Sequence, residues 1–163
     1  MKNAILFVIL LSGLIACNSH SENIKLQSRI DSLEKKIGTT YKPGFGEFMS
    51  GIQVHHAKLW FAGINENWEL ADFEMHEIKE NIDAIKDYHA ERPESKSLSM
   101  LGPAMDSVSK AVEQKNLSLF KPSYVLLTNT CNDCHKAVNF SFNEVKIPDS
   151  PPFSNQSFKK KTE

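Results

Sequence analysis

Cys131-Asn132-Asp133-Cys134-His135 is the stretch from which the fold of this chain can be worked out. Around it, apolar or sulfur-bearing side chains recur at helical spacing, at Tyr124, Leu127, Cys131, Cys134 and Val138. Residues three and four apart share one face of a helix, so Cys131, Cys134 and His135 are expected to point the same way. The spacing predicts a last helix that begins near Pro122, because proline suits a first helical turn.

The Cys-x-x-Cys-His pattern is typical of an attachment site for c-type haem. The thiols of Cys131 and Cys134 can each add to one vinyl group, and the imidazole of His135 can be the proximal iron ligand. A structural zinc site would need two further ligands in a second short cluster, and the sequence has no second such pair. A redox dithiol usually begins a helix after a strand, whereas this one lies inside a helical pattern. The pattern therefore predicts one covalent haem c.

The amino-terminal residues have the pattern of an export signal. Lys2 precedes an apolar run over residues 4–11, and the apolar stretch ends at Leu14-Ile15-Ala16-Cys17. That ending resembles the lipobox of bacterial lipoproteins, which implies a signal peptide over 1–16 and lipidation of Cys17. The resemblance also implies a membrane anchor on the periplasmic side, and Asn18 in place of aspartate favours the outer membrane. An uncleaved membrane helix is the alternative, for which the segment is short.

The cysteine count agrees with this assignment. The chain has three cysteines, of which Cys17 would carry the lipid while Cys131 and Cys134 carry the haem, so no structural disulfide is expected. Covalent haem attachment in bacteria takes place outside the cytoplasm, where an export signal sends the chain. The formal net charge of −1 gives no field that would favour nucleic acid as a partner.

Helical periodicity predicts four helices of bundle length and no strand. We expect the helical domain to span residues 43–139, beginning at Pro43-Gly44 and separated into helices by short polar loops, including one over 92–99. Gly63 is a candidate C-cap of the first helix, and Asn65 and Asn67 are candidate N-caps of the second. The expected helices cover residues 45–62, about 67–89, 100 or 103 to 115, and 122 onward. The fold class predicted is all-α, an antiparallel four-helix bundle with the haem on its last helix.

Two further segments flank this domain. Residues 17–42 carry Leu26, Ile30, Leu33 and Ile37 at heptad spacing, which predicts a short helix. Two interpretations stay open: the helix packs on the domain, or it is a coiled-coil stalk that pairs two copies. Residues 140–163 contain three prolines and several aromatic residues. We expect residues 140–158 to pack back on the bundle, and one place for them is over an exposed haem edge.

A carboxyl-terminal haem motif on the fourth helix of a bundle resembles the cytochrome c′ and cytochrome b562 superfamily. The resemblance covers roughly residues 44–139 and rests on architecture and motif position. In the common small cytochrome c fold a methionine after the motif is the second ligand, whereas all five methionines here precede His135. A closer resemblance is to small exported bacterial haem proteins of unknown role, in the segments 56–63, 67–71, 77–80 and 154–156.

The resemblance implies that the residue opposite the haem comes from the first helix. That helix has one stripe at spacings of four, three, four and three, formed by Met49, Gln53, His56, Trp60 and Gly63. Met49 is the candidate distal iron ligand, with core packing as its alternative. His56 is the second candidate, Gln53 could hydrogen-bond a distal ligand or a haem propionate, and Tyr124 could contact the haem.

These residues allow three functions. The favoured one is a lipid-anchored, single-haem electron carrier that serves extracytoplasmic redox proteins. The alternative is a five-coordinate haem that binds or senses nitric oxide or carbon monoxide, as an apolar distal residue would permit. An enzyme such as a peroxidase would need a distal acid–base group, for which His56 is the candidate. Bundles of this kind often form homodimers.

Overall fold

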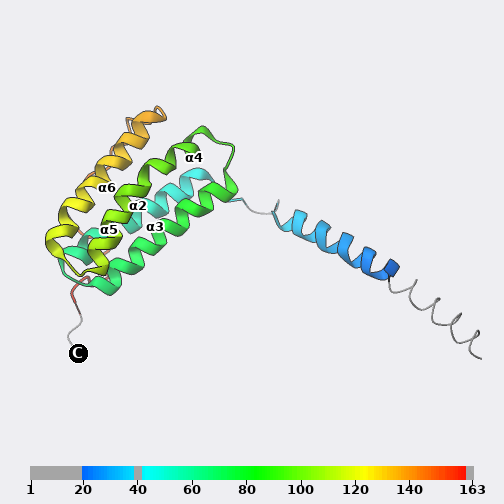
Figure 1. Ribbon diagram of the computed structural model, residues 1–163, viewed down its shortest axis with the longest axis horizontal. Helices are drawn as coiled ribbons and strands as arrows, with labels where there is room; N and C mark the ends of the chain where they lie inside the picture. Colours follow the sequence, from blue (N-terminus) through cyan, green and yellow to red (C-terminus); the bar gives the residue numbers. More distant parts are fainter. Residues whose placement is uncertain (1–19, 39–41, 161–163) are drawn as a thin grey trace, which may run out of the picture. The chain divides into compact units, whose positions relative to one another are not determined.

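The computed structural model describes residues 20–38 and 42–160. These belong to two separate units, one within residues 1–42 and one within 43–163. All regular structure in the described ranges is helical, as the sequence predicts (Figure 1). The signal peptide and Cys17 lie outside the described residues. Among the residues that are described, no helix is both long and apolar enough to cross a membrane.

Residues 20–38, the described part of the amino-terminal unit before residue 42, form a helix. The four aliphatic side chains at heptad spacing are all exposed, by fractions between 46% and 72%: Leu26, Ile30, Leu33 and Ile37.

The larger unit begins with α2, Phe45–Ile64, and α3, Trp68–Tyr88, which pack along each other. The side chain of Asn67 accepts a hydrogen bond from the N–H of Leu70, so this residue is the N-cap that its sequence position suggests. Between the two helices Glu74 is fully buried, and its Oε2 lies 2.6 Å from Nδ1 of His55.

The prediction of a polar loop over residues 92–99 is wrong. The chain forms a short helix α4, Pro93–Ser97, and a 3-10 turn, Leu98–Leu101, before α5, Gly102–Glu113. Pro93 starts a helix here, because its missing N–H costs nothing at a first helical position. Leu98 and Leu101 are buried, and the burial of these two apolar side chains stabilises the turn that follows the polar residues of α4.

The last helix, α6, spans Leu117–Ala137 and begins five residues before the predicted start. Asn116 caps it by accepting from the N–H of Leu119, and the burial of Phe120 fixes the added turn. Pro122 lies inside the helix, where its ring removes one backbone hydrogen bond in the second turn. The cap and the buried ring outweigh that loss.

Three helices end in the same backbone motif. Glu66, Lys115 and Asn139 have φ angles of 55°, 50° and 66°, and each follows the end of a helix. After α2, the N–H of Glu66 donates to the carbonyl of Gly63 and that of Asn67 to Ala62. The same pair of bonds closes α5 and α6, which identifies three Schellman motifs without glycine.

Gly63 is therefore not the C-cap that the sequence suggests. It lies in the last turn of α2, where a Cβ atom would overlap the ring of Phe120. The absence of a side chain lets α6 approach α2 at this point. Phe120 also contacts Trp60 and Trp68, so one buried ring joins three helices.

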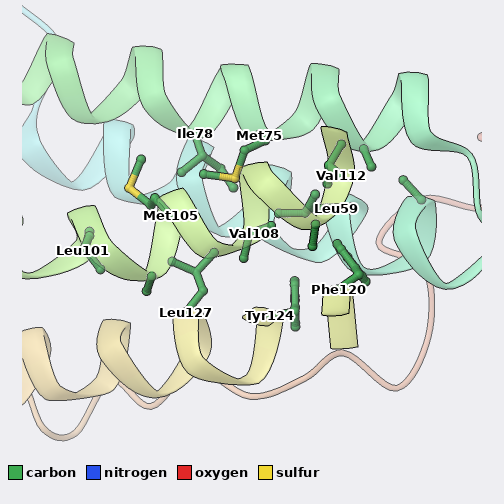
Figure 2. Close-up of a cluster of buried hydrophobic side chains, with 14 of the residues drawn as sticks. Leu59, Met75, Ile78, Leu101, Met105, Val108, Val112, Phe120, Tyr124 and Leu127 are labelled. Carbon is green, nitrogen blue, oxygen red and sulfur yellow. The ribbon is translucent and has the colours of Figure 1, made fainter. Parts of the chain in front are cut away.

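The core lies between α2, α3, α5 and α6 (Figure 2). Leu59, Met75, Val108 and Leu127 each come from a different helix and are all at most 2% exposed. Over residues 138–160 the tail after α6 has no regular structure, yet it packs on this core as expected. Phe158 is buried against Phe61, with ring centroids 5.7 Å apart.

Candidate functional site

The stripe on α2 that the sequence singles out faces α6. At one end the Trp60 ring contacts the rings of Tyr124 and Phe120, with ring centroids 4.9 Å and 6.2 Å apart. At the other end Met49 and Gln53 face the Cys-x-x-Cys-His stretch across a cavity. One helix face thus provides both a packed aromatic end and an open end.

The open end is a cavity of about 200 Å³. Cys131, Cys134 and His135 form one wall and Met49 and Gln53 form another. The remaining lining residues are mainly apolar or small: Gly46, Ser50, Ile52, Leu98, Leu101, Asn143 and Val145. Five of the residues that sequence reasoning proposed for a cofactor site therefore lie together.

A second cavity of about 300 Å³ adjoins the first and shares Gly46, Met49 and His135 with it. Phe45, Val138 and Phe140 make much of this space apolar, and Arg92 adds a cationic group. The guanidinium of Arg92 lies 2.8 Å from a carboxylate oxygen of Glu94 and 5.0 Å from the centroid of the Phe45 ring.

His135 is held by the chain that follows α6. Its Nδ1 lies 2.6 Å from the carbonyl oxygen of Asn143, which can only accept, so Nδ1 carries the proton and donates. Nε2 is then the atom with a free lone pair. Metal-binding histidines commonly have this arrangement, in which a backbone carbonyl fixes the tautomer and orients the ring.

Asn132, between the two cysteines, fixes the same segment. Its Nδ2 donates to the carbonyl of Val145, and its Oδ1 accepts from the N–H of Val145, both at 2.8 Å. This two-bond clamp holds residues 143–145 against the cysteine wall, where Asn143 and Val145 line the cavity. The intervening position of the Cys-x-x-Cys stretch therefore has a structural role.

Both thiols are in the protonated form. Burial, with a smaller contribution from Cys134, raises the pKa of Cys131 to about 12, and burial also raises the pKa of Cys134. Reactive redox dithiols have the opposite property, a lowered thiol pKa. Sγ of Cys134 also lies 3.7 Å from the carbonyl oxygen of Ser97.

His56 and Tyr124 do not line either cavity. His56 is 4% exposed, with Nε2 at 3.0 Å from Oγ1 of Thr128 and Nδ1 at 2.9 Å from the hydroxyl of Tyr124. Burial lowers the pKa of His56 to about 4, so the ring is neutral. Neither residue therefore lines the cavities beside the Cys-x-x-Cys-His stretch, and an iron-ligand role for His56 and a haem contact for Tyr124 stay predictions.

Sequence reasoning missed several residues of the site. Leu98 belongs to the segment predicted to be a loop, and Leu101 lies between the two predicted starts of the next helix. Asn143 and Val145 belong to the irregular tail. Helical periodicity carries no signal for residues outside regular helices. Asn132 had a signal, because a short amide next to two candidate attachment residues is well placed to hold backbone.

Comparisons with known proteins find no matching family model, no matching curated protein and no matching solved structure. Within residues 20–38 and 42–160, no group of three histidine, cysteine, aspartate or glutamate side chains is arranged to hold a metal ion by itself.

Proposed function

We propose that this protein is a single-haem c-type cytochrome that carries electrons between extracytoplasmic redox partners. The observation that carries the proposal is the cavity that joins Cys131, Cys134 and His135 to Met49. When bound, covalent haem c would supply a one-electron iron couple. The chain would supply two attachment thiols, an axial imidazole and an apolar enclosure.

The residues present fit such a group. Both thiols and the imidazole line one cavity, and Nε2 of His135 is available because Nδ1 donates to Asn143. Gly46 lines both cavities, and a Cβ atom there would meet nothing within 4 Å, so this wall has open space beside it. Arg92 could pair with a haem propionate at the second cavity.

Met49 is the proposed distal ligand. A thioether ligand raises the potential of haem iron and leaves no open coordination position, which suits electron transfer. His56, the second candidate, is engaged at both ring nitrogens away from the cavity. The same placement removes the acid–base group on which a peroxidase function would depend.

Gas binding is the second candidate function, and the composition of the cavity favours it as the alternative. The strong side-chain donors for iron in the lining are Met49, His135 and the two cysteines proposed for haem attachment. If Met49 packs as a core residue, Ile52, Leu98 and Leu101 would leave an apolar distal side. Iron would then be five-coordinate and could bind nitric oxide or carbon monoxide.

The finer architecture belongs to the same proposal. We infer an antiparallel four-helix bundle of the cytochrome c′ and b562 kind, made by α2, α3, α5 and α6. Short connections between α2 and α3 and between α5 and α6, and the packing within each pair, support it. The lipidated Cys17 and the extracytoplasmic, membrane-anchored location rest on the amino-terminal sequence alone.

Mass spectrometry and optical spectroscopy test the proposal on protein produced with a cytochrome c maturation system. We expect the wild-type chain to carry the added mass of one haem, and the variant with Cys131→Ser and Cys134→Ser to lack it. Recovery of the wild-type chain with unmodified thiols or bound zinc would contradict haem attachment.

The distal ligand separates the two functions. Met49→Ala should abolish a ferric methionine–iron charge-transfer band, whereas Met100→Ala, at an exposed position, should leave it unchanged. A wild-type protein that lacks the band, is high-spin when ferrous and changes its spectrum with carbon monoxide would favour gas binding.

A further inference from the structure

The helix over residues 20–38 has an apolar stripe that no described residue of its own unit covers. Leu26, Ile30, Leu33 and Ile37 are 58%, 46%, 52% and 72% exposed. Four large aliphatic side chains on one face of an exposed helix are unusual in water, because each would gain about 1.5–3 kcal/mol on full burial. The spacing of four, three and four residues is that of a coiled-coil seam.

We propose that this stripe pairs with the same stripe of a second copy, as a parallel two-stranded coiled coil. In the heptad register that the spacing sets, Ile30 and Ile37 occupy a positions, and Leu26 and Leu33 occupy d positions. β-Branched residues at a with leucine at d favour two parallel strands over three or four.

Two further residues in the same register fit this arrangement. Asn23 falls at the preceding a position, where a buried asparagine pairs with its counterpart and specifies a dimer in register. Arg29 falls at g and Glu34 at the following e position. In a parallel dimer each g residue lies beside the next e residue of the partner, so Arg29 and Glu34 would form two symmetric ion pairs.

Ile24 provides a matched control on the same helix. Ile24 is 57% exposed, much like the seam residues. It lies two residues before Leu26, which is about 200° around the helix, so it is on the side of the helix away from the seam. Its register position is b, which faces solvent in a two-stranded coil. The same substitution at Ile24 and Ile30 therefore changes hydrophobicity and charge equally and differs only in position.

Sedimentation equilibrium of the chain from Asn18 onward tests the proposal, at concentrations up to about 1 mM because so short a coil is weak. We expect a monomer–dimer equilibrium, weakened at least about tenfold by Ile30→Glu and unchanged by Ile24→Glu. Arg29→Glu should weaken it and Glu34→Arg in the same chain should restore it, as a parallel pairing requires. Circular dichroism checks that the helical domain stays folded in each variant.

Three outcomes would overturn the proposal. A wild-type chain that stays monomeric would leave the stripe to another occupant, such as the helical domain of the same chain or a lipid surface. Equal weakening by Ile24→Glu and Ile30→Glu would show that the seam is not the interface. A dimer that survives Ile30→Glu would place the contact elsewhere on the chain. The experiment measures association of the chain and not its haem content, so its result is independent of the proposed cytochrome function.

Discussion

The hydroxyl of Tyr124 lies 2.9 Å from Nδ1 of His56, between α2 and α6 and away from both cavities. The same hydroxyl lies 2.8 Å from the backbone carbonyl of His56, to which it donates, and the Thr128 hydroxyl donates to the carbonyl of Tyr124. Nε2 of His56 lies 3.0 Å from Oγ1 of Thr128, so both ring nitrogens have a polar neighbour on α6. Burial lowers the pKa of the ring, which favours its neutral form.

The free energy of unfolding should fall as the pH is lowered through the titration of His56. The pKa is about 4 in the folded protein and about 6.5 in the unfolded chain, so the unfolded state binds the proton first. Stability is then fully present above about pH 6.5 and is lost towards pH 4, by at most about 3 kcal/mol. Urea unfolding across this range measures the loss.

His56→Gln should flatten the pH dependence between pH 4 and 6.5, because an amide does not titrate there. His76→Gln, at an exposed position on α3, is the control and should keep the wild-type slope. An equal slope in wild type and His56→Gln would mean that other groups produce the effect.

Gly63→Ala should destabilise the protein despite the better helix propensity of alanine. The added methyl group would overlap the ring of Phe120, which is fully buried against Trp60 and Trp68. We expect a net loss of about 1–2 kcal/mol, since overpacking costs about 1–3 kcal/mol and the propensity gain is smaller. Gly102→Ala, where a Cβ meets nothing within 4 Å, should be neutral or stabilising in the same thermal unfolding experiment.

Asn132→Ala should release the segment that holds His135. The variant loses both hydrogen bonds to Val145, and with them the position of the Asn143 carbonyl. We expect hydrogen exchange at the Val145 amide to accelerate at least about tenfold, for a local loss of about 1–2 kcal/mol. Asn129→Ala, at an exposed position one turn earlier on α6, should leave that amide protected; equal protection in both variants would show that the clamp is not needed.

Lys115→Gly should stabilise the protein. Lys115 has a φ of 50° in the Schellman motif after α5, a conformation that costs a lysine about 1 kcal/mol and a glycine almost nothing. Asn139→Gly, at the equivalent position after α6, should give a smaller gain because asparagine tolerates this conformation. An unfolding midpoint lowered by Lys115→Gly would contradict this account.

Periodicity predicted the helices and the stripe that joins Met49 to Gly63, because burial of one helical face imposes a period that the residues must follow. It placed His56 on that stripe but could not say that Tyr124 and Thr128 would engage its ring. That outcome depends on how α6 packs against α2, which the pattern of apolar residues along either helix does not reveal.

The contribution of Asn143 was beyond reach for a different reason. The carbonyl that orients His135 is a backbone group, and any residue type at that position presents one. A sequence therefore carries little sign of it. The clamp from Asn132 to Val145 is what brings that carbonyl into place.

Gly46 and Val145 line the same cavity, although nearly the whole helical domain separates them along the chain. A ribosome delivers Gly46 early and Val145 almost last, so this cavity is completed only when synthesis of the domain is nearly over. A chain that stops after α6 would hold both thiols and the imidazole but not the carbonyl that aims the ring. The two thiols and the alignment of the imidazole thus come from separate segments, and a chain must extend to Val145 to have both.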